Sequence, residues 1–365
     1  MDFRYSTEQL DFRDSMRDFL REATPLSWVR DVAGTHGHDE TLWQRVCRDL
    51  ELPGLPVSPD YGGVGGTLVE SAIVFGEFGR ALTPVPLASH AFAVQAVVSM
   101  GSEEQRHRLL PGLLSGERIA AFAATGPDAA DPASATVWAT SDGERTLLDG
   151  ECVPVLHGHV AGMLVVAARS DDDPVGLYVV NRDAPGVGVE RLPSFDVTRP
   201  VARVTLRRAE AERLDGAPGE FERVLDIARV LLAAEMLGGA EACLELSVEY
   251  SRSRRQFDRA IGTFQAVKHM CAEMAIEIDA TRVAVMYAAM SFDDPGELAI
   301  AAPLVKAQAA DTFTLCAGTA TQVHGGIAFT WEHDLHLYLR RAKTTEALFG
   351  SSTQHRALLA DRVGL

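Results

Sequence analysis

The sequence predicts an α+β fold in which helices, then strands, then helices again follow one another along the chain. Residues 6–100 place apolar side chains near helical spacing, and residues 120–208 consist of short apolar runs separated by turn residues. Long helical patterns return after residue 220. Because runs of strands between runs of helices favour segregated layers, we expect separate domains. We place them at residues 1–119, 120–215 and 216–365.

The first helical segment begins close to the N-terminus. Thr7 is the expected N-cap, because a helical apolar pattern starts at Leu10 and continues to Leu20. Residues 52–67 are rich in Gly and Pro and are expected to form a rigid turn between helices. No strand precedes these glycines and no GK[ST] follows them, so a phosphate-binding loop is disfavoured.

The middle segment reads as strands, and Asp142-Gly143 is a hairpin signal between two of them. The last segment carries apolar faces, for example Leu225, Val230 and Leu237, and should form a four-helix bundle. Such a bundle is a natural core for a dimer or tetramer.

Composition excludes several classes of function. The 365 residues carry a net charge of −17, which argues against nucleic acid as a partner. Five cysteines lie singly, as expected of a reducing cytoplasm, and the N-terminus lacks a signal-peptide pattern. No apolar run is long enough for a membrane span, and the histidines show no metal-ligand spacing. A GxSxG elbow is also missing, which removes a serine hydrolase.

Three segments resemble signatures of the acyl-CoA dehydrogenases, flavoenzymes that desaturate an acyl-CoA thioester between Cα and Cβ. They are residues 52–67 (LPGLPVSPDYGGVGGT), 250–269 (YSRSRRQFDRAIGTFQAVKH) and 322–356 (QVHGGIAFTWEHDLHLYLRRAKTTEALFGSSTQHR). The resemblance extends over essentially the whole chain. It implies an N-terminal helical domain, a middle β-barrel-like domain and a C-terminal four-helix bundle. It also implies FAD as cofactor, an acyl-CoA substrate and electron-transfer flavoprotein as the electron acceptor.

In this family the ADP half of FAD reaches residues of a neighbouring subunit. An arginine suits this role because its planar fork can bond pyrophosphate oxygens and stays charged. Alternatives are a solvated helix end for the arginines and a helix C-cap for the glycines. The two matching segments together favour the ADP contact. Its candidates are Arg254, Phe257, Gln265, Gln322, His324, Gly325 and Gly326.

The flavin-ring half departs from the family pattern. Residues 125–131 keep Thr125 and Pro127 but lose the usual acid. Further on, Pro154 and Leu156 replace a tryptophan and a hydroxyl residue that face the flavin in relatives. Proline lacks an N–H and leucine cannot donate a hydrogen bond, so we expect this chain not to hold the flavin ring by itself. The alternative is that other residues replace these contacts. Secondary candidates on this side are Thr125 and Ser351.

Both positions where family members carry the catalytic glutamate lack an acid here. Phe349 occupies one of them and Ala228 the other. α-Proton removal needs an acceptor, which neither side chain provides. Glu235 and Glu346 are possible displaced bases. Glu235 lies in an apolar run that would raise its pKa, although a buried pair with an arginine is the preferred interpretation, and Glu346 reads equally as a surface acid.

These observations favour the partner subunit of an α2β2 acyl-CoA dehydrogenase, of the kind found in actinobacterial pathways. Such a subunit contributes the ADP side of a shared FAD site, while a catalytic subunit supplies the glutamate and the flavin contacts. Two alternatives remain open. One is a self-sufficient homo-oligomer with a displaced base, and the other is a structural or regulatory paralogue without catalysis.

Overall fold

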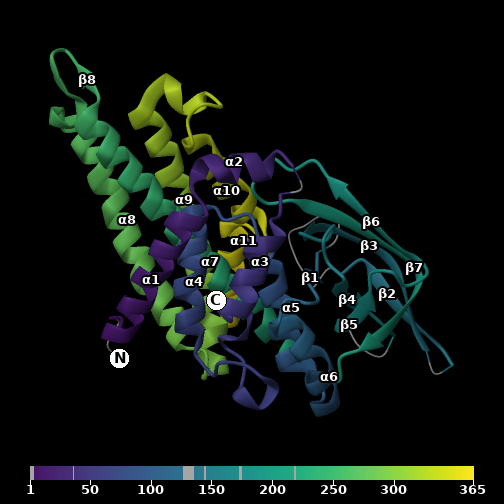
Figure 1. Cartoon of the computed structure of the whole chain (residues 1–365). Helices are drawn as coiled ribbons and strands as arrows, with labels where there is room; N and C mark the ends of the chain where they lie inside the picture. The colour runs from purple at the N-terminus through teal and green to yellow at the C-terminus, as the bar shows by residue number, and fades with distance from the viewer. Residues whose placement is uncertain (1–3, 36, 126–134, 144, 172–174, 218) are drawn as a thin grey trace.

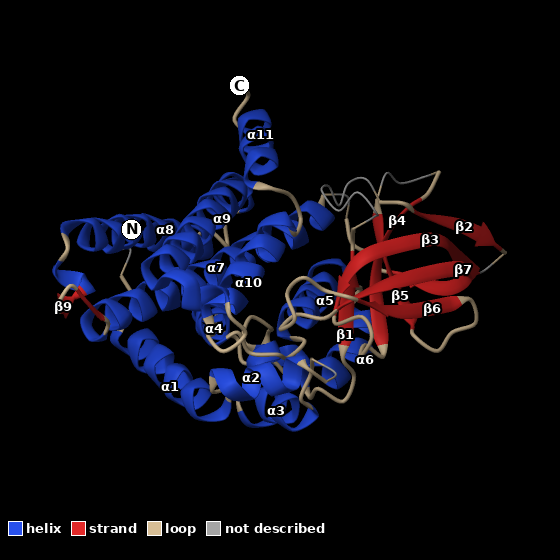
Figure 2. Cartoon of the chain, turned by 90° about the horizontal axis from the view of Figure 1, so that it is seen from above, coloured by secondary structure: helices blue, strands red, loops and turns tan. Residues whose placement is uncertain are grey.

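The structure, a computed structural model, forms a helical body with a β-sheet domain on one side (Figures 1 and 2). The N-terminal and C-terminal helices pack together, although the strands separate them in the sequence. The described residues are 4–35, 37–125, 135–143, 145–171, 175–217 and 219–365. Among them, no helix is both long enough and apolar enough to cross a membrane.

The N-terminal part is helical, as expected, and its first cap differs by one residue. Ser6, rather than Thr7, caps the first helix: its Oγ accepts from the backbone N–H of Gln9 at 3.2 Å, and the Gln9 side chain accepts in return from the Ser6 N–H at 3.0 Å. This reciprocal capping box satisfies two otherwise unpaired donors. The helices are α1 (Thr7–Ala23), α2 (Leu26–Ala33), α3 (Glu40–Gln44), α4 (Leu68–Ala81), α5 (Leu87–Met100) and α6 (Glu103–Leu114).

The strands close into a ring, which confirms the expected β-barrel-like domain. Pairing runs from β4 through β2, β3, β7 and β5 and back to β4, while β1 adds to β4 and β6 adds to β7. Asp142 pairs with Arg145 across the expected hairpin, where Gly143 has a φ of 69°. The strands are β1 (Ala120–Ala123), β2 (Val137–Asp142), β3 (Arg145–Leu156), β4 (Met163–Arg169), β5 (Gly176–Asn181), β6 (Val187–Leu192) and β7 (Val201–Arg213).

Strand β4 shows why the middle segment reads as continuous apolar runs. Met163 and Val165 belong to the core shared with the helices, whereas Leu164 and Val166 belong to a separate core within the sheet. Side chains of a strand alternate between faces, and both faces of β4 are covered. The strand is therefore apolar at successive positions rather than at every second one.

The C-terminal part is built on three long helices, and α10 and α11 both pack against α9. Helix α4 approaches α7 closely, because a Cβ on Gly238 would lie 1.8 Å from the carbonyl oxygen of Gly76. Only glycine permits that crossing. The elements are α7 (Glu220–Ser253), the short hairpin β8 (Arg255–Gln256) and β9 (Arg259–Ala260), α8 (Gln265–Met290), α9 (Pro295–His324), α10 (Leu335–Ala347) and α11 (Ser352–Arg362).

Candidate active site

Phe349, at the first base position, lies just after α10 and is buried in an aromatic cluster. Its ring centroid is 5.7 Å from that of Phe92 and 6.1 Å from that of Phe122, both in edge-to-face geometry. Phe75 continues the cluster beyond Phe92. Only 6% of Phe349 is exposed. The position at which the family resemblance implies a base therefore holds a buried aromatic ring.

A buried lysine supports the backbone beneath this ring. The Nζ of Lys306, on α9, donates to the carbonyl oxygens of Thr345 and Glu346 at 3.1 Å and of Gly350 at 3.4 Å. These carbonyls include unpaired acceptors at the end of α10. Burial, together with the charge of Arg229, lowers the pKa of Lys306 to about 7. Our sequence reasoning missed this residue, although a lysine within the apolar run AAPLVKAQAA was a signal for it.

Ala228, at the second base position, is fully buried in α7. The acid nearest to it in sequence, Asp226, is already engaged. It accepts from Arg229 Nη1 at 2.5 Å and from Arg362 Nη1 at 2.9 Å. No carboxylate is thus free at this turn of the helix among the described residues.

Glu235 takes part in a buried ion-pair network, which we call the Glu235 cluster: Asp196, Thr198, Arg199, Glu235 and Arg341. Glu235 pairs with Arg199 and, at 3.1 Å, with Arg341 Nη1. Arg341 also pairs with Asp196. Burial alone would raise the pKa of Asp196, but Arg341 and Arg199 outweigh it and hold that pKa below its usual range. Two acids and two arginines balance, so the geometry favours a structural ion pair over a base.

Glu346 lies at the surface of α10. Its Oε2 is 3.2 Å from Lys343 Nζ and accepts from Thr314 Oγ1 at 3.4 Å. Phe349, three residues later, points instead into the aromatic core. The two side chains therefore do not share a pocket.

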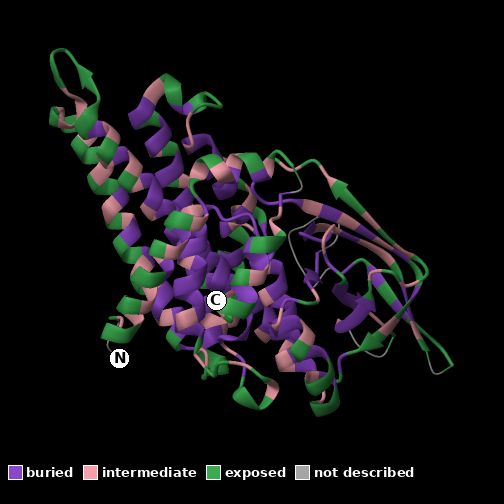
Figure 3. Cartoon of the chain, in the orientation of Figure 1, coloured by how far each residue is buried: buried purple, intermediate pink, exposed green. Residues whose placement is uncertain are grey.

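The first ADP-side segment forms the exposed tip of the helical bundle. Arg254 caps α7, the β8–β9 hairpin follows, and Gln265 begins α8. Phe257, in the hairpin, is 85% exposed. Among the described residues, the Arg254 guanidinium has no hydrogen-bond or ion-pair partner. Figure 3 shows this tip as exposed, in contrast to the buried centre of the bundle.

The second ADP-side segment ends at the same tip. His324 closes α9, and its ring stacks on Tyr250 of α7 with 4.2 Å between centroids. Burial lowers the pKa of His324. A Cβ on Gly325 or Gly326 would meet no atom within 4 Å, so this backbone is open to a ligand. The structure thus brings together both segments, including the exposed Gln322.

The flavin side has a cavity, from which the expected tryptophan and hydroxyl residue are missing. The cavity of ≈ 390 Å³ lies between the sheet domain and α10, and Thr125, Pro154 and Leu156 line it. The Thr125 hydroxyl donates to the Pro154 carbonyl at 3.1 Å. Ser351 bonds with Gln354 in the capping box of α11. Both hydroxyls are therefore engaged, and residues 126–134, which include the departure from the family's acidic motif, lie outside the described residues.

These residues suit the ADP half of FAD, whereas the flavin half lacks two of the side chains that the family resemblance implies. The tip offers an unpaired guanidinium, an exposed aromatic ring and open glycine backbone, which suit a pyrophosphate and adenosine. The cavity presents Pro154 and Leu156 at the positions where the resemblance implies a tryptophan and a hydroxyl residue, and its remaining lining includes the donors Ser194, Lys343 and Thr344.

Comparison with known proteins settles the family. Residues 6–117 match the acyl-CoA dehydrogenase N-terminal domain, and residues 220–364 match the acyl-CoA dehydrogenase C-terminal domain. The chain belongs to the acyl-CoA dehydrogenase family. This confirms the resemblance and the fold that the motifs indicated.

Several relatives are similar along almost the whole length of the chain. Acyl-CoA dehydrogenase IpdE2 of Mycobacterium tuberculosis is 33% identical over 91% of this chain and 89% of its own length. The solved Tcur3481-Tcur3483 steroid acyl-CoA dehydrogenase variant is 30% identical with a TM-score of 0.91, covering 98% of both chains. The ChsE4-ChsE5 complex from Mycobacterium tuberculosis is 26% identical with a TM-score of 0.91, covering 100% of this chain and 99% of that one.

Proposed function

We propose that this acyl-CoA dehydrogenase homologue is the base-lacking subunit of a heteromeric enzyme, and that it contributes the ADP side of a shared FAD site. The observation that carries the proposal is Phe349, sealed among Phe92 and Phe122 where the reaction needs a proton acceptor. A partner subunit would supply the glutamate.

The separation of the two half-sites supports sharing between chains. Figures 1 and 2 show the β8–β9 hairpin at one end of the helical bundle and the sheet domain on the opposite side. Arg254 and Gln322 lie at the first end, whereas the cavity lined by Pro154 lies against the sheet. One FAD molecule would therefore meet the tip of this chain and the cavity of another.

The division of chemical roles follows from the residues. FAD, when bound, accepts the β-hydride, and electron-transfer flavoprotein would carry the electrons away. Arg254 would hold the pyrophosphate, Gln265 and Gln322 would bond along the ADP portion, and Phe257 would cover the adenosine. A partner's carboxylate would remove the α-proton of the acyl-CoA.

An exposed apolar stripe supports association through α8 and α9. On α8, Ile276, Val283 and Met290 recur at seven-residue spacing and are 66%, 50% and 36% exposed. Leu304 and Leu315 are exposed on the neighbouring α9. A stripe of this spacing packs against helices of another chain. Together with the heteromeric and steroid-acting relatives, it supports an α2β2 enzyme for bulky, steroid-like CoA thioesters.

The decisive experiment is to purify the chain alone and together with a catalytic acyl-CoA dehydrogenase subunit, and to record the visible spectrum and the FAD content. We expect no stoichiometric flavin in the lone chain and one FAD per heterodimer in the complex. A lone chain that purifies with stoichiometric FAD would sink the proposal.

Stoichiometric FAD in the lone chain would favour a self-sufficient homo-oligomer, an alternative that one observation supports. The cavity beside Thr125 persists despite the lost donors, so a flavin ring has space there. Acyl-CoA-dependent bleaching of the lone chain would establish that alternative. A paralogue without any cofactor role is disfavoured by the unpaired Arg254 beside the open QVHGG backbone.

A further inference from the structure

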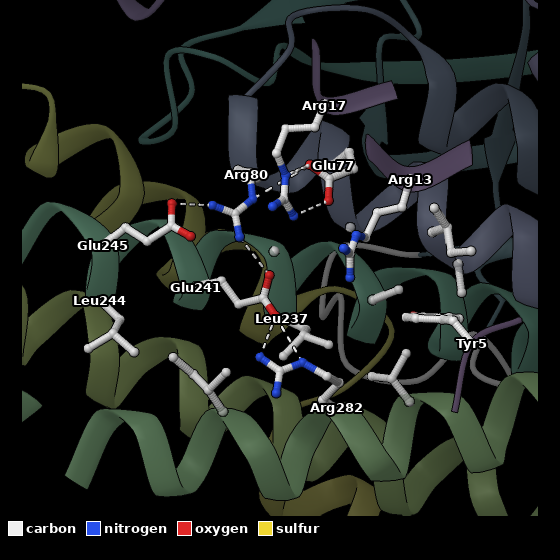
Figure 4. A pocket seen from close by; sticks show the side chains of 17 residues that line it. Tyr5, Arg13, Arg17, Glu77, Arg80, Leu237, Glu241, Leu244, Glu245 and Arg282 are labelled. Atoms are coloured by element: carbon white, nitrogen blue, oxygen red, sulfur yellow. Dashed lines mark hydrogen bonds and ion pairs between the residues drawn. The ribbon is translucent and has the colours of Figure 1, made fainter. Parts of the chain in front are cut away.

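A second pocket, of ≈ 270 Å³, lies where α1 crosses α4, α7 and α8. It shares no lining residue with the base position, the sheet-side cavity or the ADP-side tip. Ion-paired side chains and apolar side chains both line it (Figure 4). The apolar wall consists of Ala72, Ile73, Leu237, Leu244, Ile278 and Val285.

The charged wall is a chain of alternating ion pairs. Arg17 Nη2 bonds Glu77 Oε1 at 2.6 Å, and Arg80 Nη2 bonds Glu241 Oε2 at 2.7 Å. Arg282 Nη2 reaches the same Glu241 at 2.8 Å. These pairs fix the carboxylates in place and orient them toward arginines rather than toward a ligand.

Arg13 is the lining cation outside this chain of pairs. Its guanidinium bonds to the neighbouring Asp14 at 2.8 Å, and Asp14 is 63% exposed, so water competes for that pair. Figure 4 shows Arg13 reaching into the pocket toward Leu237. The lining holds four arginines and three glutamates, and Asp14 and Asp279, outside the lining, pair with Arg13 and Arg282.

Tyr5 stands beside Arg13 at the same pocket. Burial raises the pKa of its phenol, which therefore keeps a proton to donate at neutral pH. Among the described residues, its hydroxyl has no hydrogen-bond partner. Figure 4 shows its side chain beside the apolar wall.

We propose that this pocket binds a short aliphatic carboxylate, held at its head by Arg13 and Tyr5 and along its chain by the apolar wall. A carboxylate ligand would take the place of the exposed Asp14 carboxylate at Arg13. A phosphate dianion would add uncompensated charge beside three glutamates, and an amine would be repelled by Arg13. The small volume and the apolar wall select a short hydrocarbon chain over a bare anion.

Calorimetric titration of the whole chain with sodium hexanoate tests this site, and the heat is read without any flavin or partner. We expect saturable binding of one hexanoate per chain. Hexan-1-ol, hexylamine and inorganic phosphate should give no saturable heat at the same concentrations. Absence of saturable hexanoate binding, or equal binding of hexan-1-ol, would overturn the proposal.

Variants on α1 locate the site. Arg13→Gln should weaken hexanoate about tenfold, because a charge-assisted bond is lost, and Tyr5→Phe should weaken it by roughly threefold. Arg21→Gln is the matched control, since Arg21 is on the same helix, is 76% exposed and pairs with Asp18. Unchanged affinity in Arg13→Gln contradicts the assignment. If Arg13→Gln does not fold, as judged by circular dichroism, unchanged hexanoate affinity in Tyr5→Phe contradicts the assignment instead.

Discussion

At the scale of single residues, Phe349 is part of the core, so placing an acid there lowers the stability of the fold. A glutamate at this position would be buried among Phe92 and Phe122 without a charged partner. We expect Phe349→Glu to lower the free energy of unfolding by about 3 kcal/mol, measured by urea denaturation. Phe349→Leu, which keeps the site apolar, should cost less. Equal stability of the Glu variant and the native chain would show that the aromatic cluster is not a sealed plug.

Lys306 makes the stability of the same region depend on pH. Its pKa is about 7 in the folded chain, against about 10.4 in an unfolded chain. Between these pH values the unfolded state binds more protons than the folded state. The free energy of unfolding therefore increases as pH rises and decreases as pH falls toward 7. Relative to that of the Lys306→Met variant, the free energy of unfolding of the native chain should increase by about 1.4 kcal/mol per pH unit between pH 7.5 and 9.

Urea denaturation of both proteins at each pH measures that difference. Other titrating groups, among them the buried thiols of Cys47 and Cys152 whose pKa values burial raises, contribute equally to both proteins and cancel. If the difference in free energy of unfolding between the two proteins stays constant with pH, the pKa of Lys306 is not lowered in the folded chain.

At the scale of elements, the Glu235 cluster joins three parts of the fold. Asp196, Thr198 and Arg199 come from the loop before β7, Glu235 from α7 and Arg341 from α10. Removing one partner of a buried network leaves uncompensated charge. We therefore expect Glu235→Gln to lower the free energy of unfolding by about 3–5 kcal/mol in a denaturant titration.

The matched control is Asp311→Asn on α9, which breaks an ion pair with Arg356 whose two side chains are 46% and 56% exposed. Exposed pairs contribute little, so its loss should stay below about 1 kcal/mol. Similar losses in both variants would mean that Glu235 does not hold the elements together.

At the scale of the whole molecule, the periodicity of apolar residues was enough to predict the order of helices and strands. The spacing of the motifs was enough to predict the family. Both signals are local. A buried pair of Glu235 with an arginine was predicted and is confirmed, but its partners could not be named, because Arg199 and Arg341 lie far from Glu235 in the chain and meet it only when the loop before β7, α7 and α10 pack. Arg13 and Arg17 likewise meet the pocket residues of α4 and α7 only when α1 packs over those helices. The residues of the candidate ADP side could be proposed from the sequence because each of its two segments carries its own motif.

The last prediction concerns the assembled enzyme and the shared cofactor. In the complex with a catalytic subunit, Arg254→Ala should weaken the binding of FAD by about 1.5–3 kcal/mol, since a charge-assisted contact to the pyrophosphate is lost. FAD retention during dilution and gel filtration, followed by flavin absorbance, measures this. Arg208→Ala is the control, because Arg208 is exposed on β7, away from the bundle tip. Unchanged FAD retention in Arg254→Ala would exclude this arginine from the proposed cofactor site.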